Sequence, residues 1–191
     1  MPLRSTEHGW GALVRAFHWL VAALIVAQGV IGLSMVQMDL TPAKVRVFAL
    51  HKSIGMTILA LVLLRIAWRL TERRPADPPA MPHWQRQAAH ALHLALYVLI
   101  LALPLSGWWF NSAANAPLVW FGWLDLPSLT GGLDPVWKPR ALLLHQTLFW
   151  VLAALLVGHV GAALWHHFGQ RDDVLRRMAV GSGKPNREVR P

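Results

Sequence analysis

Four long apolar runs, separated by shorter polar or charged stretches, dominate the pattern of the chain. They cover residues 16–36, 48–70, 88–110 and 141–167. A helix rises about 1.5 Å per residue, so about 20 apolar residues cross the hydrocarbon core of a bilayer. Each run is long enough for one crossing. The pattern therefore predicts an all-α integral membrane protein, a four-helix bundle that forms a single domain over residues 1–191.

The segments that flank these runs are polar and differ in length. Residues 71–86 are rich in proline and charge, which predicts a non-helical linker. Residues 111–140 contain prolines, glycines and three tryptophans, and we expect an ordered cap at the membrane surface that could include a short helix. Residues 171–191 form a polar, basic tail. The first run lacks a signal-peptide cleavage site, so we expect it to remain in the mature protein.

Composition narrows the class further. Hydrophobic residues make up 55% of the chain and charged residues only 14%, which is typical of a small helical membrane protein rather than a soluble domain. The absence of cysteine excludes disulfides, iron–sulfur clusters, thiolate metal sites and covalent c-type haem. The net charge of +9 does not point to nucleic acid, because the basic residues lie at the ends of the apolar runs. That placement reports membrane topology.

The distribution of Lys and Arg predicts which side each end occupies. With both termini and the linker 71–86 on one side, most of the 18 basic residues lie on that side. By the positive-inside rule, both termini are cytoplasmic and the opposite face is periplasmic, as in a bacterial inner membrane. The basic residues of the outer side are Lys44, Arg46, Lys52, Lys138 and Arg140.

Four histidines fall at matched depths in the predicted spans. His18 lies near the inner end of the first span, His51 near the outer end of the second, and His145 near the outer end of the fourth. His159 follows His145 by 14 residues, which places it about 21 Å deeper and within about 40° of the same helix face. Depth therefore pairs His51 with His145 and His18 with His159, which predicts two bis-histidine sites stacked across the bilayer.

A haem b is the expected occupant of each site. Imidazoles bind haem iron on both sides of the porphyrin, and helical bundles build such sites from facing helices. These four histidines are then iron ligands, and two stacked haems form a path for electrons. Zinc or copper would need more ligands at one depth. Hydrogen-bonded packing histidines and a proton path are the other readings, and a proton path would more often use acidic residues, which the spans lack.

Short motifs along most of the chain match one known family. They are FHWL at His18, LHKSIGM at His51, AHALHLALY from Ala89, ALPLSG from Ala102, LHQTL at His145, GHVGAALWHHF from Gly158 and DDVLRRM near the end. In this order and spacing, the chain resembles the bacterial cytochrome b561 family. The resemblance is to its superoxide-oxidase type, which moves electrons from superoxide to ubiquinone. It implies an oxidoreductase with two b haems and agrees with the ligand pairs derived from depth.

The resemblance also implies a ubiquinone site at the inner face that involves His93 and His166. Histidines there can hydrogen-bond the quinone carbonyls and deliver protons. Tyr97, one turn beyond His93, could line the same pocket or serve packing. We expect His90 and His167 to be interfacial residues, and we assign no role to His8 or His83, which lie outside the spans.

Positive charge at the outer face would attract the superoxide anion. Lys52 adjoins His51, and Lys138 and Arg140 precede His145. These three residues are the candidates for superoxide attraction, and contact with haem propionates is an equally good reason for their placement. Arg65, 14 residues after His51, could meet inner propionates or anionic lipid, and the same holds for Arg15.

A second function remains open beside the enzyme. The motifs mark haems more clearly than they mark the electron donor, and related bundles act as electron-transfer subunits that exchange electrons between quinone and a periplasmic redox partner. Stable co-purification with such a partner would favour this alternative. Most tryptophans gather at the two ends of the spans, which predicts an aromatic belt at the membrane interfaces rather than electron relays.

Overall fold

The computed structural model describes residues 2–7, 9–77 and 81–181, and it is mainly helical. His8 and the end of the basic tail, from residue 182 on, lie outside the described residues. The elements are, in chain order, α1 (Ala12–Gln37), α2 (Pro42–Leu70), α3 (His83–Ala113), β1 (Val119–Trp120), β2 (Leu124–Asp125), α4 (Trp137–Leu164), the π-helix η1 (Trp165–Gln170) and α5 (Val174–Ala179).

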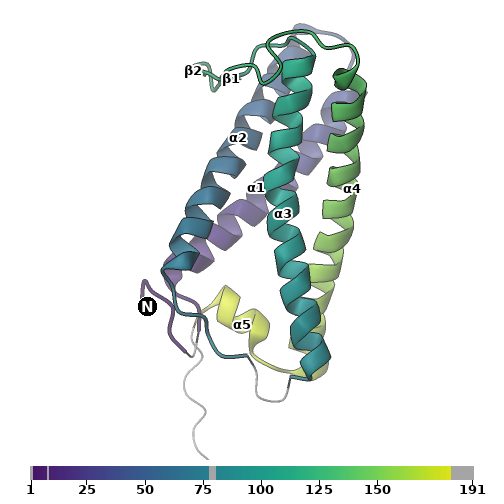
Figure 1. Cartoon of the computed structure of the whole chain (residues 1–191). Coiled ribbons are helices and arrows are strands. Elements are labelled where there is room, and N and C mark those ends of the chain that lie inside the picture. The colour runs from purple at the N-terminus through teal and green to yellow at the C-terminus, as the bar shows by residue number, and fades with distance from the viewer. Residues whose placement is uncertain (1, 8, 78–80, 182–191) are drawn as a thin grey trace, which may run out of the picture.

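Four helices are long and apolar enough to cross a membrane: α1, α2, α3, and α4 together with η1. They run up and down as a bundle in which α1 packs on α2 and α3 packs on α4, while α2 joins the two pairs by packing on α3 (Figure 1). The four-helix fold expected from the apolar runs is therefore confirmed. Many large apolar side chains on these helices are exposed, among them Val26, Leu64, Leu94 and Val157. This exposure fits a surface in contact with lipid.

Two apolar clusters hold the helices together. Val21 of α1 packs with Ile58 and Val62 of α2. Leu96 and Leu99 of α3 pack with Leu152 of α4, and partly buried residues of α3 touch both clusters. Helix α3 thus takes part in both clusters, and Ile25 of α1 also packs against both.

The starts of the helices explain where they differ from the predicted spans. Helix α2 begins six residues before its apolar run, because the Thr41 side chain accepts a hydrogen bond from the Lys44 amide and Pro42 occupies the first turn. Helix α3 begins at His83, directly after Pro82. The prediction of a non-helical linker up to residue 86 was therefore wrong for its last four residues, since a proline before the first turn permits a helix.

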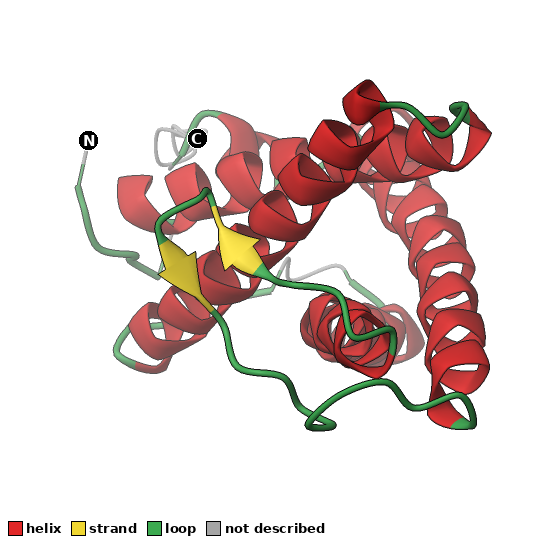
Figure 2. Ribbon diagram, turned by 90° about the horizontal axis from the view of Figure 1, so that it is seen from above, coloured by secondary structure: helices red, strands yellow, loops and turns green. Residues whose placement is uncertain are grey.

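The loop between α3 and α4, called the outer cap below, forms a β-hairpin. The short helix considered for this loop is absent from its described residues. Strands β1 and β2 pair antiparallel, and Phe121 and Gly122 in the turn both have positive φ. The hairpin lies over the bundle end next to α2, where Ser53 Oγ accepts from the Phe121 amide and Trp120 Nε1 donates to Thr57 Oγ1 (Figure 2).

The end of the bundle opposite the hairpin, called the inner end below, carries the chain start, the linker after α2 and the short helix α5 (Figure 1). Helix α5 falls in the predicted polar tail. Arg15 and Trp19 of α1 donate hydrogen bonds to the carbonyls of Ala179 and Met178. Carbonyls in the last turn of a helix lack partners within that helix and can accept such bonds. Arg177 of α5 donates to the carbonyl of Ala76 in the linker. The start of the tail is therefore ordered against the bundle.

Candidate haem and quinone sites

The outer level of the bundle holds one pair of facing imidazoles. His51 of α2 and His145 of α4 have ring centres 6.3 Å apart, and their planes make an angle of 80°. The backbone of a neighbouring helix lies close to each ring, because a Cβ at Gly32 would be 3.1 Å from His51 Cε1 and one at Gly107 would be 3.1 Å from His145 Cε1. Glycine at these two positions therefore makes room for the rings.

The inner level holds the second pair. His18 of α1 and His159 of α4 also have ring centres 6.3 Å apart, with an angle of 66° between their planes. Helix α4 thus contributes one histidine to each level. The structure brings together the same two pairs that depth in the spans predicts.

The separation within each pair allows a test of whether haem fits. A metal–imidazole bond is about 2.0 Å long, so two imidazoles on opposite sides of one metal have ring centres roughly 6 Å apart. Both pairs have this separation. Among the described residues, no group of three or more His, Asp or Glu is arranged to hold a metal ion. Two opposed imidazoles at each level fit bis-histidine haem better than they fit tetrahedral zinc.

Hydrogen bonds around His145 favour the tautomer that a ligand needs. Its Nδ1 lies 3.1 Å from the carbonyl oxygen of Leu103 and 3.0 Å from Oγ of the buried Ser106. A carbonyl accepts only, so Nδ1 carries the hydrogen and the Nε2 lone pair is available for iron. His51 differs, because its Nδ1 is buried and has no hydrogen-bond partner within the described residues. Within the outer pair, His51 therefore lacks the kind of hydrogen bond that orients the His145 ring.

Arg65 lies beside the inner pair. Its Nη1 and Nη2 are each 3.2 Å from Nδ1 of His18, and its guanidinium stands 5.7 Å from the ring centre of Tyr97. A guanidinium can only donate, so this contact needs a bare Nδ1. If Nε2 of His18 binds iron, Nδ1 holds the hydrogen and Arg65 is free to pair with an anion. A haem propionate at the inner level fits that requirement.

The two histidines expected at the quinone site occupy different places. His93 of α3 contacts His159 directly, with ring centres 5.3 Å apart, so it lies beside an expected iron ligand. His166 lies in η1, where its Nδ1 is 2.5 Å from Oδ2 of Asp172. The described contacts do not join His93 to His166. Tyr97 packs against the cluster of Val21, Ile58 and Val62, and its buried hydroxyl has no hydrogen-bond partner within the described residues.

The three outer basic residues also differ in their surroundings. Lys52 Nζ donates to Asn111 Oδ1 and to the carbonyl of Pro117, which ties α2 to the outer cap. The Arg140 guanidinium stacks over the ring of Trp137 at 4.9 Å. Lys138 precedes it in the first turn of α4. Lys52 therefore stabilises the contact between α2 and the outer cap. Lys138 and Arg140 of α4 are the better candidates for attracting an anion.

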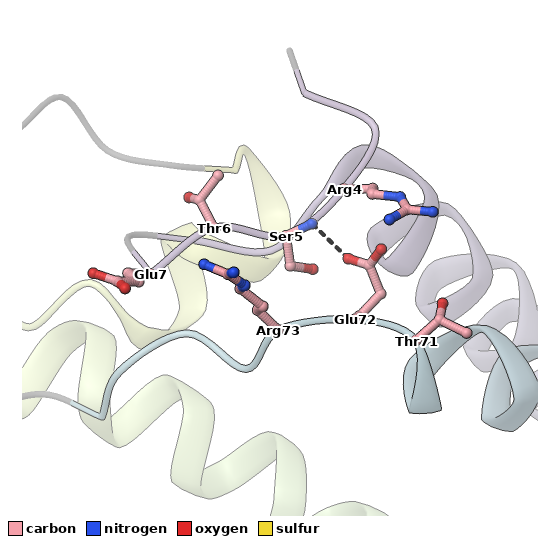
Figure 3. Close-up of a pocket in the computed structure, with 7 residues that line it drawn as sticks. All are labelled: Arg4, Ser5, Thr6, Glu7, Thr71, Glu72 and Arg73. Carbon is pink, nitrogen blue, oxygen red and sulfur yellow. Dashed lines mark hydrogen bonds between the residues drawn. The ribbon is translucent and has the colours of Figure 1, made fainter.

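A polar hollow of about 480 Å³ opens at the inner end between the chain start and the linker after α2. Figure 3 shows residues 4–7 of the chain start next to residues 71–73 of the linker, with the Ser5 amide donating to Glu72. Acidic and basic side chains both line this hollow. None of the predicted haem-ligand or quinone residues is among its lining residues. The hollow is lined by Arg4, Ser5, Thr6, Glu7, Thr71, Glu72 and Arg73.

Sequence reasoning missed several residues that support the site. Asp172 and Ser106 stand 6 and 39 positions from the histidines that they contact. The aspartate stands in the DDVLRRM motif, which gave no hint of its partner, and the serine stands in ALPLSG, which marked the family only. Hydrogen bonding between separate elements leaves no periodic signal in a sequence.

Comparison with known proteins adds independent information. The sequence profile of the family described as prokaryotic cytochrome b561 matches residues 9–181. The chain is 35% identical over 179 residues to cytochrome b561 homolog 2 of Escherichia coli K12, covering 93% of this chain and 95% of that protein. It is 32% identical over 130 residues to cytochrome b561 homolog 1 of the same organism, covering 67% and 72%.

A more distant relative carries a more specific name. The chain is 28% identical over 177 residues to the probable superoxide oxidase CybB of Yersinia pestis, covering 88% of this chain and 94% of that protein. The match spans nearly the whole length of both proteins, so the likeness is not confined to one histidine motif.

Proposed function

The chain belongs to the prokaryotic cytochrome b561 family, and we propose that it is a superoxide:ubiquinone oxidoreductase of the bacterial inner membrane. Membership makes it a multi-pass membrane electron-transfer protein of a family that binds haem b. The proposal adds the number of haems, the donor, the acceptor and the sidedness: superoxide is oxidised at the periplasmic face, ubiquinone is reduced at the cytoplasmic side, and both termini are cytoplasmic.

The observation that carries the proposal is that α4 presents one histidine to a facing histidine at each level. In this proposal His51 and His145 hold an outer haem b, and His18 and His159 hold an inner one. When bound, the two haems supply one-electron transfer between the membrane faces. Leu103 and Ser106 orient the His145 ring, and Arg65 offers a positive charge at the inner level.

At the outer face, Lys138 and Arg140 would raise the local concentration of superoxide by electrostatic attraction. Each superoxide anion gives up one electron and becomes oxygen. The name of the Yersinia pestis relative supports superoxide as the donor. Lys52 belongs to this proposal in a supporting role, because its ammonium is held by the outer cap.

At the inner face, ubiquinone takes two electrons and two protons to become ubiquinol. His93 and His166 are the proposed quinone contacts, since imidazoles can hydrogen-bond carbonyl oxygens and transfer protons near neutral pH. His93 lies against His159. His166 follows His159 by seven residues, about two helical turns nearer the inner end. Two molecules of superoxide thus balance one quinone.

The test is the rate of superoxide loss catalysed by purified, haem-loaded protein with a short-chain ubiquinone. We expect this protein to accelerate the loss over a haem-free control, and to form one ubiquinol for every two superoxide anions consumed. Equal rates with and without haem would contradict the proposal.

The alternative, an electron-transfer subunit with a periplasmic redox partner, has one observation in its favour. The two relatives from Escherichia coli are named only as cytochrome b561 homologues, without a donor. A haem-loaded protein that reduces ubiquinone from a co-purified periplasmic protein, but not from superoxide, would establish this reading.

A further inference from the structure

We propose that Asp172 is a positioning residue of the ubiquinone site, which orients the His166 imidazole and keeps it able to donate a proton to the quinone. This inference rests on the proposed function, because it concerns the same inner site. It assigns a role to a carboxylate that the sequence motifs left without one.

The backbone brings Asp172 back onto His166. The last turn of the fourth span is the π-helix η1, a geometry that often occurs at functional sites. Arg171 then adopts the left-handed conformation with φ 54°, which is uncommon for a residue other than glycine and reverses the chain. As a result, the Asp172 amide donates to the His166 carbonyl at 3.1 Å.

The two side chains form a second link. His166 Nδ1 lies 2.5 Å from Asp172 Oδ2, and only 14% and 20% of the two side chains are exposed. A carboxylate accepts, so Nδ1–H donates to it. The other oxygen of Asp172, Oδ1, accepts from the Val174 amide at 3.0 Å at the start of α5. Both carboxylate oxygens are therefore fixed, and they fix the ring.

This geometry decides which imidazole atom is available to a substrate. With Nδ1–H held by Asp172, the free nitrogen of His166 is Nε2. When the ring takes up a second proton, Nε2 is the nitrogen that holds it. Such an Nε2–H can donate to a quinone carbonyl oxygen and then transfer its proton.

The complete step balances in protons and electrons. Ubiquinone receives two electrons, which come from two superoxide anions, and two protons. One proton passes from His166 Nε2 to one carbonyl oxygen, and His166 then regains a proton from cytoplasmic water. The second carbonyl oxygen receives its proton from water. Asp172 accepts the hydrogen bond from Nδ1 throughout and exchanges no proton.

Helix α5 is also held by contacts that do not involve Asp172, and Asp172→Asn keeps an Oδ1 that can accept from the Val174 amide. Its end is bound by Arg15 and Trp19 of α1, and Arg177 binds both Asp173 and the carbonyl of Ala76. A substitution at Asp172 should therefore leave α5 in place. Asp173→Asn is a matched control, because it removes a carboxylate from the next position, one paired with Arg177 and not with a histidine.

The experiment uses the haem-loaded full-length chain in detergent, with short-chain ubiquinone as the probe. Protein reduced with dithionite is mixed with quinone, and haem reoxidation is followed by stopped-flow absorbance. For Asp172→Asn we expect the limiting rate constant of reoxidation to fall about 10- to 100-fold, and the quinone concentration that gives half of this limiting rate to change less than about threefold. Asp172→Glu should recover part of the rate, and Asp173→Asn should stay within about twofold of wild type.

A double-mutant cycle tests whether Asp172 acts through His166. His166→Gln alone should slow reoxidation, and adding Asp172→Asn to it should cost less than about a further twofold. If Asp172 served only to hold α5, its loss would slow the His166→Gln protein by the same factor as wild type. Haem spectra and melting temperatures of all variants report whether the fold is kept.

The possible outcomes distinguish the two proposals. A wild-type limiting rate constant in Asp172→Asn, a change in the half-saturating quinone concentration alone, or a full additional loss in the double variant would overturn the role of Asp172. Wild-type protein that is reoxidised by quinone but never reduced by potassium superoxide would overturn the donor while leaving the Asp172 comparison intact. Wild-type protein that quinone does not reoxidise would overturn both.

Discussion

The imidazoles of His18 and His159 face each other across the inner end of the bundle at 6.3 Å, the same separation that divides the outer pair. Two sites built at opposite ends of a bundle thus share one spacing. This equality is expected when each pair of rings must hold the same kind of group between them.

The first prediction concerns haem content. His159→Ala should lower the content from about two haems per chain to about one, because a single remaining imidazole holds haem weakly. His145→Ala should do the same at the outer level, and the double variant should retain almost none. Pyridine haemochrome assays measure the content. His90→Ala is the control, because His90 is exposed and its Nε2 contacts Arg74 rather than either imidazole pair. An unchanged haem content in His159→Ala would contradict the assignment.

The second prediction concerns the close approach of Gly107 to His145. A Cβ there would stand 3.1 Å from the ring, so Gly107→Leu should displace the imidazole and lose the outer haem. The reduced-minus-oxidised spectrum should then fall to about half its amplitude. Gly161→Leu is the matched control, because no described atom beyond its chain neighbours and its own helix backbone lies within 4 Å of where its Cβ would stand. Full haem content in Gly107→Leu would show that the ring has more room than the structure gives it.

The third prediction concerns Arg65 and the potential of the inner haem. Replacing it by Met removes a positive charge next to His18, and a nearby cation favours the reduced form of iron. We expect the lower or the upper of the two midpoint potentials, whichever belongs to the inner site, to fall by about 50 mV. Redox titration in a spectroelectrochemical cell measures this shift. Arg46→Gln, at the outer side, should leave the same potential unchanged.

The fourth prediction separates attraction of superoxide from support of the cap. Lys138→Gln with Arg140→Gln should lower the second-order rate constant with superoxide by about two- to fivefold at low ionic strength, and the difference should vanish in about 0.5 M salt. Lys52→Met should instead lower the stability of the protein by about 1–3 kcal/mol, because it leaves Asn111 and Pro117 without their donor. A loss of rate in the double variant that salt does not alter would argue against electrostatic attraction.

The sequence was a good guide wherever the cause is periodic and local. Apolar runs predict the four helices, and the 14-residue spacing of His145 and His159 predicts their common face, because helix geometry is regular over that length. The places where prediction failed have another cause. The hairpin that begins at Val119 depends on contacts of the loop with α2. The start of α3 at His83 follows a proline that a helix tolerates before its first turn. The return of Asp172 onto His166 depends on the left-handed conformation of Arg171.

The π-helix at His166 illustrates this limit. A π-helix has one more residue per hydrogen-bonded turn than an α-helix, so it turns the side chains that follow it. The run WHHFGQ gives no sign of this change, and a helical wheel continued from His159 would misplace Gln170 and everything after it. The geometry of the inner site was therefore less predictable from the sequence than that of the outer site.

Helix α4 is the last of the four spans along the chain, and it carries one member of each histidine pair. During synthesis, the first three spans leave the ribosome with only one histidine of each pair. Under the proposed haem assignment, neither site can hold haem between two imidazoles until α4 has entered the membrane beside the other spans. Order of synthesis thus delays the proposed cofactor capture until α4 has been made, and a chain that stops before α4 would lack one histidine of each pair.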